Sequence, residues 1–400
     1  MNLRSSVRRI TISALALGAA SIVGLPVPAS AAPPAADGTA ARPLTPPGPP
    51  SAGGAVYVLT NDPAHNAVTV FARGHDGRLT ETGTVRTSGR GGSETGAVVD
   101  PLASQGALTY DAVHHLLYAV NAGSNTLSVF SARGTDLRLL QVVDTAGRFP
   151  SSVAVAGNLV YVLDAGGSGA VTGFRVTGGR LHAIAGSTRT LGLSNAAIPQ
   201  FLASPSQVAI SPDGAHLIVS TKSGGTLLVY GLDVTGKPSA APRVTTSAAG
   251  VPFALTFDAA GRLQVAAASG SAATYRIEHT GALTLVSGPV ANGQAATCWS
   301  VRIGNHLYTA NAGSNTITGY RIGAGGALSL LDPSGVTAHT DAGPVDLAAS
   351  PDGRFLYQQA TGAGAIDEYA VNADGSLTSL GTVAGLPADN GSGIEGIATS

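Results

Sequence analysis

The 400-residue chain has few charged side chains and a single cysteine. Charged residues make up 11% of it and the net charge is −1, so no basic surface is available to bind phosphate backbones, and we expect no nucleic-acid partner. Cys298 has no second cysteine with which to form an internal disulfide. The sequence also contains no G-x-S-x-G, Walker A or H-E-x-x-H pattern. We expect no resident metal and no cofactor.

The first 31 residues have the pattern of a secretory signal peptide. Three arginines precede an apolar stretch over 10–23, and an A-x-A cleavage site follows at 29–31. The stretch is short and is followed by two prolines, which disfavours a spanning helix, although an uncleaved anchor is the alternative. We therefore predict a secreted, extracellular protein without stable membrane insertion, exported by the general or the twin-arginine route. The Pro- and Ala-rich segment 32–53 is predicted to be a disordered linker.

Most of the remaining chain is built from a repeated block, in which an apolar strand, a Gly/Asn/Ser turn and a strand with one aromatic residue follow one another. The copies lie roughly 43–61 residues apart, as expected for propeller blades with loop insertions. The last unit predicts four strands over 345–350, 354–359, 365–371 and 376–383, with Asp-Gly turns at 352–353 and 374–375. The pattern indicates an all-β, seven-bladed β-propeller over residues 54–400, with four-stranded antiparallel blades.

One aromatic residue occupies the third strand of every unit. We expect these residues to share a packing role between neighbouring blades, with ligand stacking as the alternative. They are Phe71, Phe130, Phe174, Tyr230, Tyr275, Tyr320 and Tyr369.

The first unit begins at its second strand, 55–60, and lacks an innermost strand. The segment 393–398 after the seventh unit matches the pattern of a first strand. We predict that this C-terminal strand completes the first blade, because an unpaired edge would otherwise remain at the seam.

Alignment of the first strands places four polar side chains at equivalent positions near one mouth of the central channel: Gln207, Cys298, Asp346 and Glu395. Two carboxylates and a thiol around one funnel could bind a cation, or one carboxylate could act as a base. The alternative is a solvated mouth that holds waters. The candidate catalytic residues are Glu395, Asp346 and Gln207, and Cys298 is interpreted as a small buried residue beside Trp299.

Two insertions lead into innermost strands and are expected on the same side as this mouth. They span 86–104 and 191–203. Glu94, Asp100 and Gln200 in these loops could overhang the channel, so Glu94 and Gln200 join the candidate ligand-binding residues.

The repeated unit, with Ser-Pro-Asp-Gly, Leu-Tyr and an Asn-x-Gly-Ser-Asn turn, resembles the lactonase family of seven-bladed propellers. This family includes 6-phosphogluconolactonase and carboxymuconate-cyclase-like proteins, and is related to propellers named for Tyr-Val-Thr-Asn repeats. Family lactonases tend to show Gly-Pro-Arg-His where a first strand begins. This chain has Gly343-Pro344-Val345-Asp346 there, and the resemblance therefore implies the fold more firmly than hydrolysis of a phosphorylated lactone.

Two functions are compatible with these patterns. The first is a secreted, monomeric binding or interaction module that uses the channel mouth to hold a small molecule or an extracellular protein. The second is an extracellular lactone hydrolase with an altered active site.

Overall fold

The computed structural model describes residues 53–389 and 392–400. The predicted signal peptide, 1–31, and the predicted linker up to residue 52 lie outside the described residues. In the part that is described, no helix is long and apolar enough to cross a membrane.

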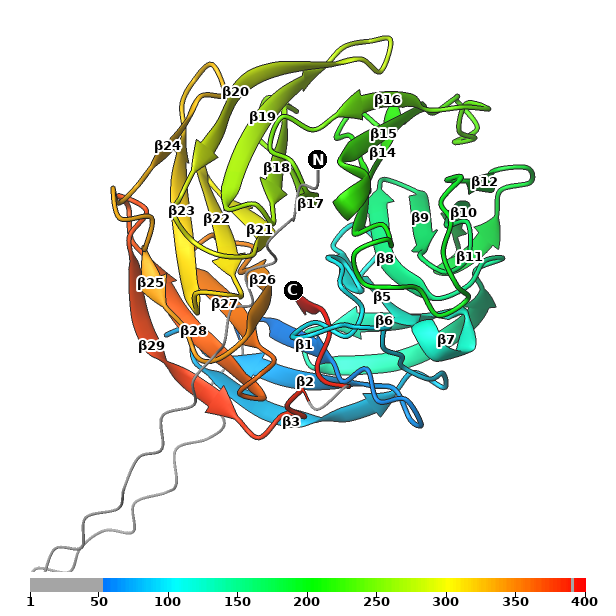
Figure 1. The fold of residues 1–400 in the computed structure, drawn as a ribbon. Coiled ribbons are helices and arrows are strands. Elements are labelled where there is room, and N and C mark those ends of the chain that lie inside the picture. Colours follow the sequence, from blue (N-terminus) through cyan, green and yellow to red (C-terminus); the bar gives the residue numbers. More distant parts are fainter. Residues whose placement is uncertain (1–52, 390–391) are drawn as a thin grey trace, which may run out of the picture. The chain divides into compact units, whose positions relative to one another are not determined.

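Seven antiparallel sheets form the blades of a propeller. Figure 1 shows them in chain order around a central channel. Blade 1 contains β1 (Ala55–Leu59), β2 (Ala67–Arg73), β3 (Leu79–Arg86) and β30 (Ile397–Thr399). Blade 2 contains β4 (Leu108–Asp111), β5 (Leu116–Asn121), β6 (Thr126–Arg133) and β7 (Asp136–Asp144), with the short helix η1 (Ala122–Ser124). Blade 3 contains β8 (Pro150–Ala156), β9 (Leu159–Asp164), β10 (Ala170–Thr177), β11 (Arg180–Ala183) and β12 (Arg189–Thr190).

The remaining four blades repeat this order. Blade 4 contains β13 (Gln207–Ile210), β14 (His216–Ser220), β15 (Thr226–Gly231) and β16 (Arg243–Thr246), with η2 (Lys222–Gly224). Blade 5 contains β17 (Pro252–Phe257), β18 (Leu263–Ala267), β19 (Ser271–Ile277) and β20 (Leu283–Ala291). Blade 6 contains β21 (Thr297–Ile303), β22 (His306–Asn311), β23 (Thr316–Ile322), β24 (Leu328–Leu330) and β25 (Ala338–His339). Blade 7 contains β26 (Pro344–Ala349), β27 (Phe355–Ala360), β28 (Ala365–Val371) and β29 (Leu377–Ala384), each within one residue of its predicted bounds.

The C-terminal strand closes the ring, as predicted. β30 pairs with β1 in the register Val56–Thr399, Tyr57–Ala398 and Val58–Ile397. Figure 1 shows the red C-terminal strand beside the blue β1. The innermost strand of blade 1 therefore comes from the far end of the chain, and neither edge of the seam is left unpaired.

The third-strand aromatic residues pack between blades, which confirms the predicted packing role. All seven are at most 3% exposed. Phe71 of blade 1 lies in one apolar cluster with Phe355 and Ile366 of blade 7, and Tyr230 of blade 4 clusters with Tyr161 and Val171 of blade 3. Each such ring fills the space against the preceding blade, which explains why so few aromatic residues suffice for the whole molecule.

A second set of rings, the second-strand tyrosines of blades 1, 3, 6 and 7, ties each of these blades to the next one. Tyr357 donates its hydroxyl hydrogen to the Gly77 carbonyl at 2.7 Å, and Tyr308 donates to the Gly375 carbonyl at 2.7 Å. Both acceptors lie in hairpin turns of the following blade, and Tyr57 makes the same type of bond to Gly134 at 2.5 Å. Buried phenol groups need such partners, so these bonds fix the spacing of the blades.

Candidate functional site

The innermost strands enclose a cavity of about 390 Å³ along the channel axis. Its walls are mainly apolar and come from β8, β13, β26 and β30, with Val153, Val208, Leu347 and Ile397 among the lining residues. The cavity opens at the ends of the innermost strands, where Tyr110, Val155 and Phe257 are half-exposed. None of the described residues that line it is Lys, Arg or His.

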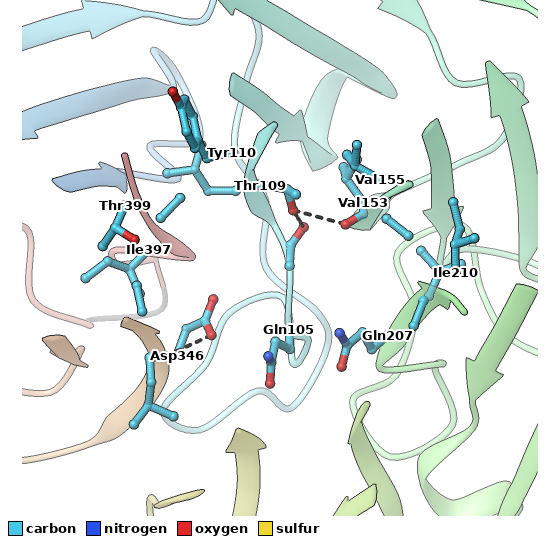
Figure 2. A pocket seen from close by; sticks show the side chains of 18 of the residues that line it. Gln105, Thr109, Tyr110, Val153, Val155, Gln207, Ile210, Asp346, Ile397 and Thr399 are labelled. Atoms are coloured by element: carbon cyan, nitrogen blue, oxygen red, sulfur yellow. Dashed lines mark hydrogen bonds between the residues drawn. The ribbon is translucent and has the colours of Figure 1, made fainter. Parts of the chain in front are cut away.

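Three polar side chains form the floor of the cavity. In the view of Figure 2, Gln105 lies between Asp346 and Gln207. Gln207 bridges to the next blade, because its Nε2 donates to the Leu255 carbonyl at 3.2 Å and its Oε1 accepts from the Leu255 amide at 2.6 Å. Gln105 makes the same two bonds across the channel to Ser300, each at 2.8 Å. Each carboxamide keeps one N–H that these bonds do not use.

Asp346 is the carboxyl group of the floor. Its Oδ1 accepts the Leu347 amide hydrogen at 2.9 Å, and the Gly106 and Ile397 amides also donate to this carboxylate. Burial nevertheless raises its pKa to about 7, because desolvation outweighs these three donors. Close to neutral pH this group therefore exchanges between a hydrogen-bond acceptor and a donor.

The opposite end of the channel is filled by part of the first insertion, residues 94–105, which we call the plug. Leu102 and Ala103 at its centre are 0% exposed. Gln105 donates its amide hydrogen to the Ser206 carbonyl at 3.1 Å and accepts from the Ser152 hydroxyl at 2.6 Å. The plug therefore makes the channel blind and supplies part of the cavity floor.

Trp299, the single tryptophan of the chain, holds the plug from blade 6. Its Nε1 donates to the Ser104 carbonyl at 2.8 Å, and its ring meets Phe253 edge to face at 5.0 Å between centroids. Cys298 beside it is 6% exposed, and burial raises the pKa of its thiol. The thiol lies among buried groups and not in the cavity lining.

Lys222 is inserted under the plug from η2. The residue is 1% exposed and has a φ of 33°, and its Nζ donates to the Ala103 carbonyl at 2.7 Å. Glu94 Oε2 lies 3.4 Å from this Nζ and accepts the Ser204 hydroxyl hydrogen at 2.8 Å. Burial raises the pKa of Glu94 to about 8 and lowers that of Lys222, while each group partly offsets the shift of the other.

A second buried pair joins the plug to the segment that precedes β30. Asp100 accepts the amide hydrogens of Ala103 at 2.7 Å and Ser104 at 3.0 Å, and Glu395 accepts that of Leu102 at 2.6 Å. The two carboxyl groups also bond to each other, which requires a proton between them. Burial raises the pKa of both carboxyl groups, and the Asp100 charge raises that of Glu395 further, so the pair shares a proton.

The structure thus divides the predicted site residues into two groups and leaves one apart. Gln207 and Asp346 lie on the cavity floor, whereas Glu94 is a buried part of the plug, and Cys298 and Glu395 are buried beneath it. Gln200 is exposed, and its Oε1 accepts the amide hydrogens of residues 202 and 203 within its own loop. The first insertion fills the channel mouth that sequence reasoning treated as open, so Glu94 and Asp100 do not overhang it.

Two residues important to this arrangement were not among the predicted ones. Gln105 lies one residue beyond the predicted insertion, and Lys222 occurs in an ordinary turn pattern. The scarcity of charge in the surrounding sequence could have identified Lys222. A single Lys between apolar strands becomes buried when the strands pack, and a buried charge needs an acidic partner. Within residues 53–389 and 392–400, no three His, Cys, Asp or Glu side chains are placed to hold a metal ion together.

Comparison with known proteins supports the same fold. The model of the family described as lactonase, 7-bladed beta-propeller, matches residues 51–192 and 168–301. A proposed 6-phosphogluconolactonase from Bacteroides uniformis is 19% identical over 87% of this chain and 99% of its own, with a TM-score of 0.65. The periplasmic gluconolactonase of Pseudomonas aeruginosa is 19% identical over 84% of this chain and 98% of its own, with a TM-score of 0.61.

These structural likenesses are too low in identity to show more than the fold. Among the curated proteins, none matches the chain in sequence. The family model, however, spans more than half of the chain, from residue 51 to residue 301. The chain therefore belongs to the lactonase family of seven-bladed β-propellers.

Proposed function

We propose that this protein is a secreted binding module that holds a small uncharged molecule in the channel cavity. The observation that carries the proposal is the lining of the cavity, which combines apolar walls with a floor of Gln105, Gln207 and Asp346 and, among the described residues, includes no cationic side chain. Such a cavity suits a ring or chain with an apolar face and a hydroxyl or carbonyl group at one end. A phosphorylated ligand would lose its hydration there without gaining a cationic partner. Secretion is supported by the signal-peptide pattern of residues 1–31.

The ligand enters from the side opposite the plug in this proposal, because the plug fills the other end. The free N–H groups of Gln105 and Gln207 would donate to the ligand, and Asp346 would accept or donate according to its protonation. The apolar walls would cover the remaining surface of the ligand.

The test compares neutral sugars and neutral sugar lactones with the corresponding acids by isothermal titration calorimetry. We expect binding of neutral members, no binding of phosphorylated ones, and loss of binding in Gln207→Leu. Gln141→Leu is the matched control, since Gln141 makes the same two bonds to the Leu181 backbone on the outer strands of blades 2 and 3. Equal loss in both variants, or preference for phosphorylated ligands, would contradict the proposal.

A second candidate function, hydrolysis of a neutral lactone, is favoured by the raised pKa of Asp346. A general base works best when its pKa lies near the operating pH. The Asp346 carboxylate would take a proton from water as the water oxygen attacks the lactone carbonyl, and the Gln207 N–H would stabilise the oxyanion. The ring C–O bond then breaks and the alkoxide takes the proton back from Asp346.

Turnover of a neutral lactone that disappears in Asp346→Asn but survives in Glu395→Gln would support this candidate. The second variant is informative because Glu395 lies under the plug, outside the cavity lining. Binding without turnover across a lactone panel would leave the binding module as the function.

A further inference from the structure

Several of the side chains that hold the plug are ionisable, although all of them are buried. The titratable side chains that face one another there are Glu94 and Asp100 from the plug, Lys222 from η2, Cys298 from β21, Asp346 from β26 and Glu395 from the segment before β30. Four carboxyl groups thus face a single lysine. Because all four carboxyl groups are buried, they cannot all be ionised at once, so the docked plug must retain protons.

We propose that the plug is a pH-controlled gate, docked under acidic conditions and released under alkaline ones, which converts the blind channel into one open at both ends. The plug is a connecting loop that belongs to no blade, so its release breaks no blade ladder and only the isolated bridge between Thr95 and Gln200. Its apolar anchorage is small, with Leu102 as the one large aliphatic side chain it buries completely. Docking therefore depends on its polar contacts with several blades.

The direction follows from proton counting. Release of the plug exposes Asp100, Glu395 and Asp346 more fully to water, where they ionise near their ordinary pKa, whereas burial keeps the pKa of each raised in the docked state. The docked state therefore binds more protons, and a rise in pH favours release. The pair of Glu94 and Lys222 contributes opposing effects to this dependence, because burial raises the pKa of Glu94 and lowers that of Lys222.

Trp299 makes the gate directly observable. It is the only tryptophan, it is 3% exposed, and its indole nitrogen donates to the Ser104 carbonyl of the plug. Release removes this bond and admits water and quencher to the ring. As the pH rises from 5 to 9, we expect a red shift of its emission and a larger acrylamide quenching constant, while the far-ultraviolet circular dichroism stays unchanged.

Glu395→Gln is the decisive variant. Its carboxamide can still accept from the Leu102 amide and can donate to Asp100, so the plug stays docked without the shared proton. We expect its pH-dependent quenching to be reduced or shifted to higher pH. Asp164→Asn is the matched control, because burial raises the pKa of Asp164 to about 8 but its hydrogen-bond partner is Thr145, outside the plug.

Hydrogen exchange gives a second measurement that does not depend on the variants. Backbone amides of residues 94–105 should exchange faster at alkaline pH, after correction for the intrinsic rate, while those of β5 and β22 keep their protection. Three results would each overturn the gate: constant quenching up to the pH at which the circular dichroism is lost, an unchanged transition in Glu395→Gln, or an equal effect of Asp164→Asn. None of these measurements requires a ligand, so failure of the gate is separate from failure of the proposed binding function.

Discussion

Removal of residues 394–400 tests how much of the propeller depends on its closing strand. The segment buries Ile394 and Ile397, which are 0% and 4% exposed. Burial of each contributes about 1.5–3 kcal/mol. Beyond the β30 ladder, three backbone bonds tie the segment to blade 1: Leu59 to Gly396 at 3.1 Å, Glu395 to Leu59 at 2.8 Å and Ser400 to Ala55 at 2.9 Å.

At about 1 kcal/mol net for each of these bonds, the segment supplies about 6–9 kcal/mol in all. This is comparable with the total stability of a typical folded protein, about 5–15 kcal/mol. We therefore expect the truncated chain to unfold at a much lower urea concentration, or to aggregate through the exposed edge of β1. The loss should exceed that of any single substitution in the segment.

The assay is urea unfolding followed by circular dichroism, with a synthetic peptide of residues 392–400 added back to the truncated chain. The peptide should restore part of the lost stability, because its binding site is the β1 edge. Ile394→Ala is the graded version, with an expected loss of about 2–5 kcal/mol, and Ile198→Ala is its control because Ile198 is 58% exposed. A truncated chain with the unfolding midpoint of the full chain would refute the reasoning.

Three further predictions address the turns, the blade contacts and the cavity floor. Gly77→Ala should destabilise the fold by about 2 kcal/mol or more, because Gly77 has a φ of 88° and a Cβ there would lie 2.3 Å from the Phe355 ring; a neutral effect in urea unfolding would be inconsistent with this packing. Tyr357→Phe should cost about 1 kcal/mol through loss of the bond to Gly77, and an unchanged midpoint would show that the hydroxyl does not tie the blades. Asp346→Asn should reduce the pH dependence of stability. Because the pKa of Asp346 is raised to about 7, the free energy of unfolding of the wild type should fall by up to about 1.4 kcal/mol per pH unit as the pH rises from about 4 to 7. The variant lacks this contribution. Parallel stability curves for wild type and variant between pH 4 and 8 would contradict the shifted pKa.

The fold was predictable because the propeller repeats its signals. An apolar second strand and one third-strand aromatic residue recur in all seven units, and Asp-Gly turns mark several of them, so an error in one unit is corrected by the others. The closing strand was predictable for a related reason. The first unit lacks an innermost strand, and the segment 393–398 has the pattern of one, although the strand that forms, β30, begins only at Ile397. Turn chemistry and alternation are local properties, which a sequence shows directly.

The site was less predictable because it depends on an insertion that occurs once. Alignment of the first strands placed Gln207 and Asp346 at equivalent positions, and the structure has both on the cavity floor. The same alignment grouped Glu395 and Cys298 with them, yet these side chains lie beneath the plug. A repeat pattern carries no information about which side chains a unique loop will cover. The position of the loop depends on contacts between residues far apart in the sequence, such as Leu102 and Glu395.

The positions of ionisable residues in the sequence would have predicted the contacts of the plug better than the repeat alignment did. In a chain with 11% charged residues, each ionisable group in an apolar setting requires a partner. Four such groups lie together at the plug and partner one another. They are Glu94 and Asp100 in the insertion, Lys222 in a turn and Glu395 before the last strand. The blades are held mainly by repeated apolar and tyrosine contacts, with isolated buried carboxyl groups such as Asp164 and Glu368, whereas the plug is held by a cluster of groups whose charge changes with pH. The two parts of the molecule should therefore respond differently to the same perturbation, with a change in pH moving the plug before it affects the ring.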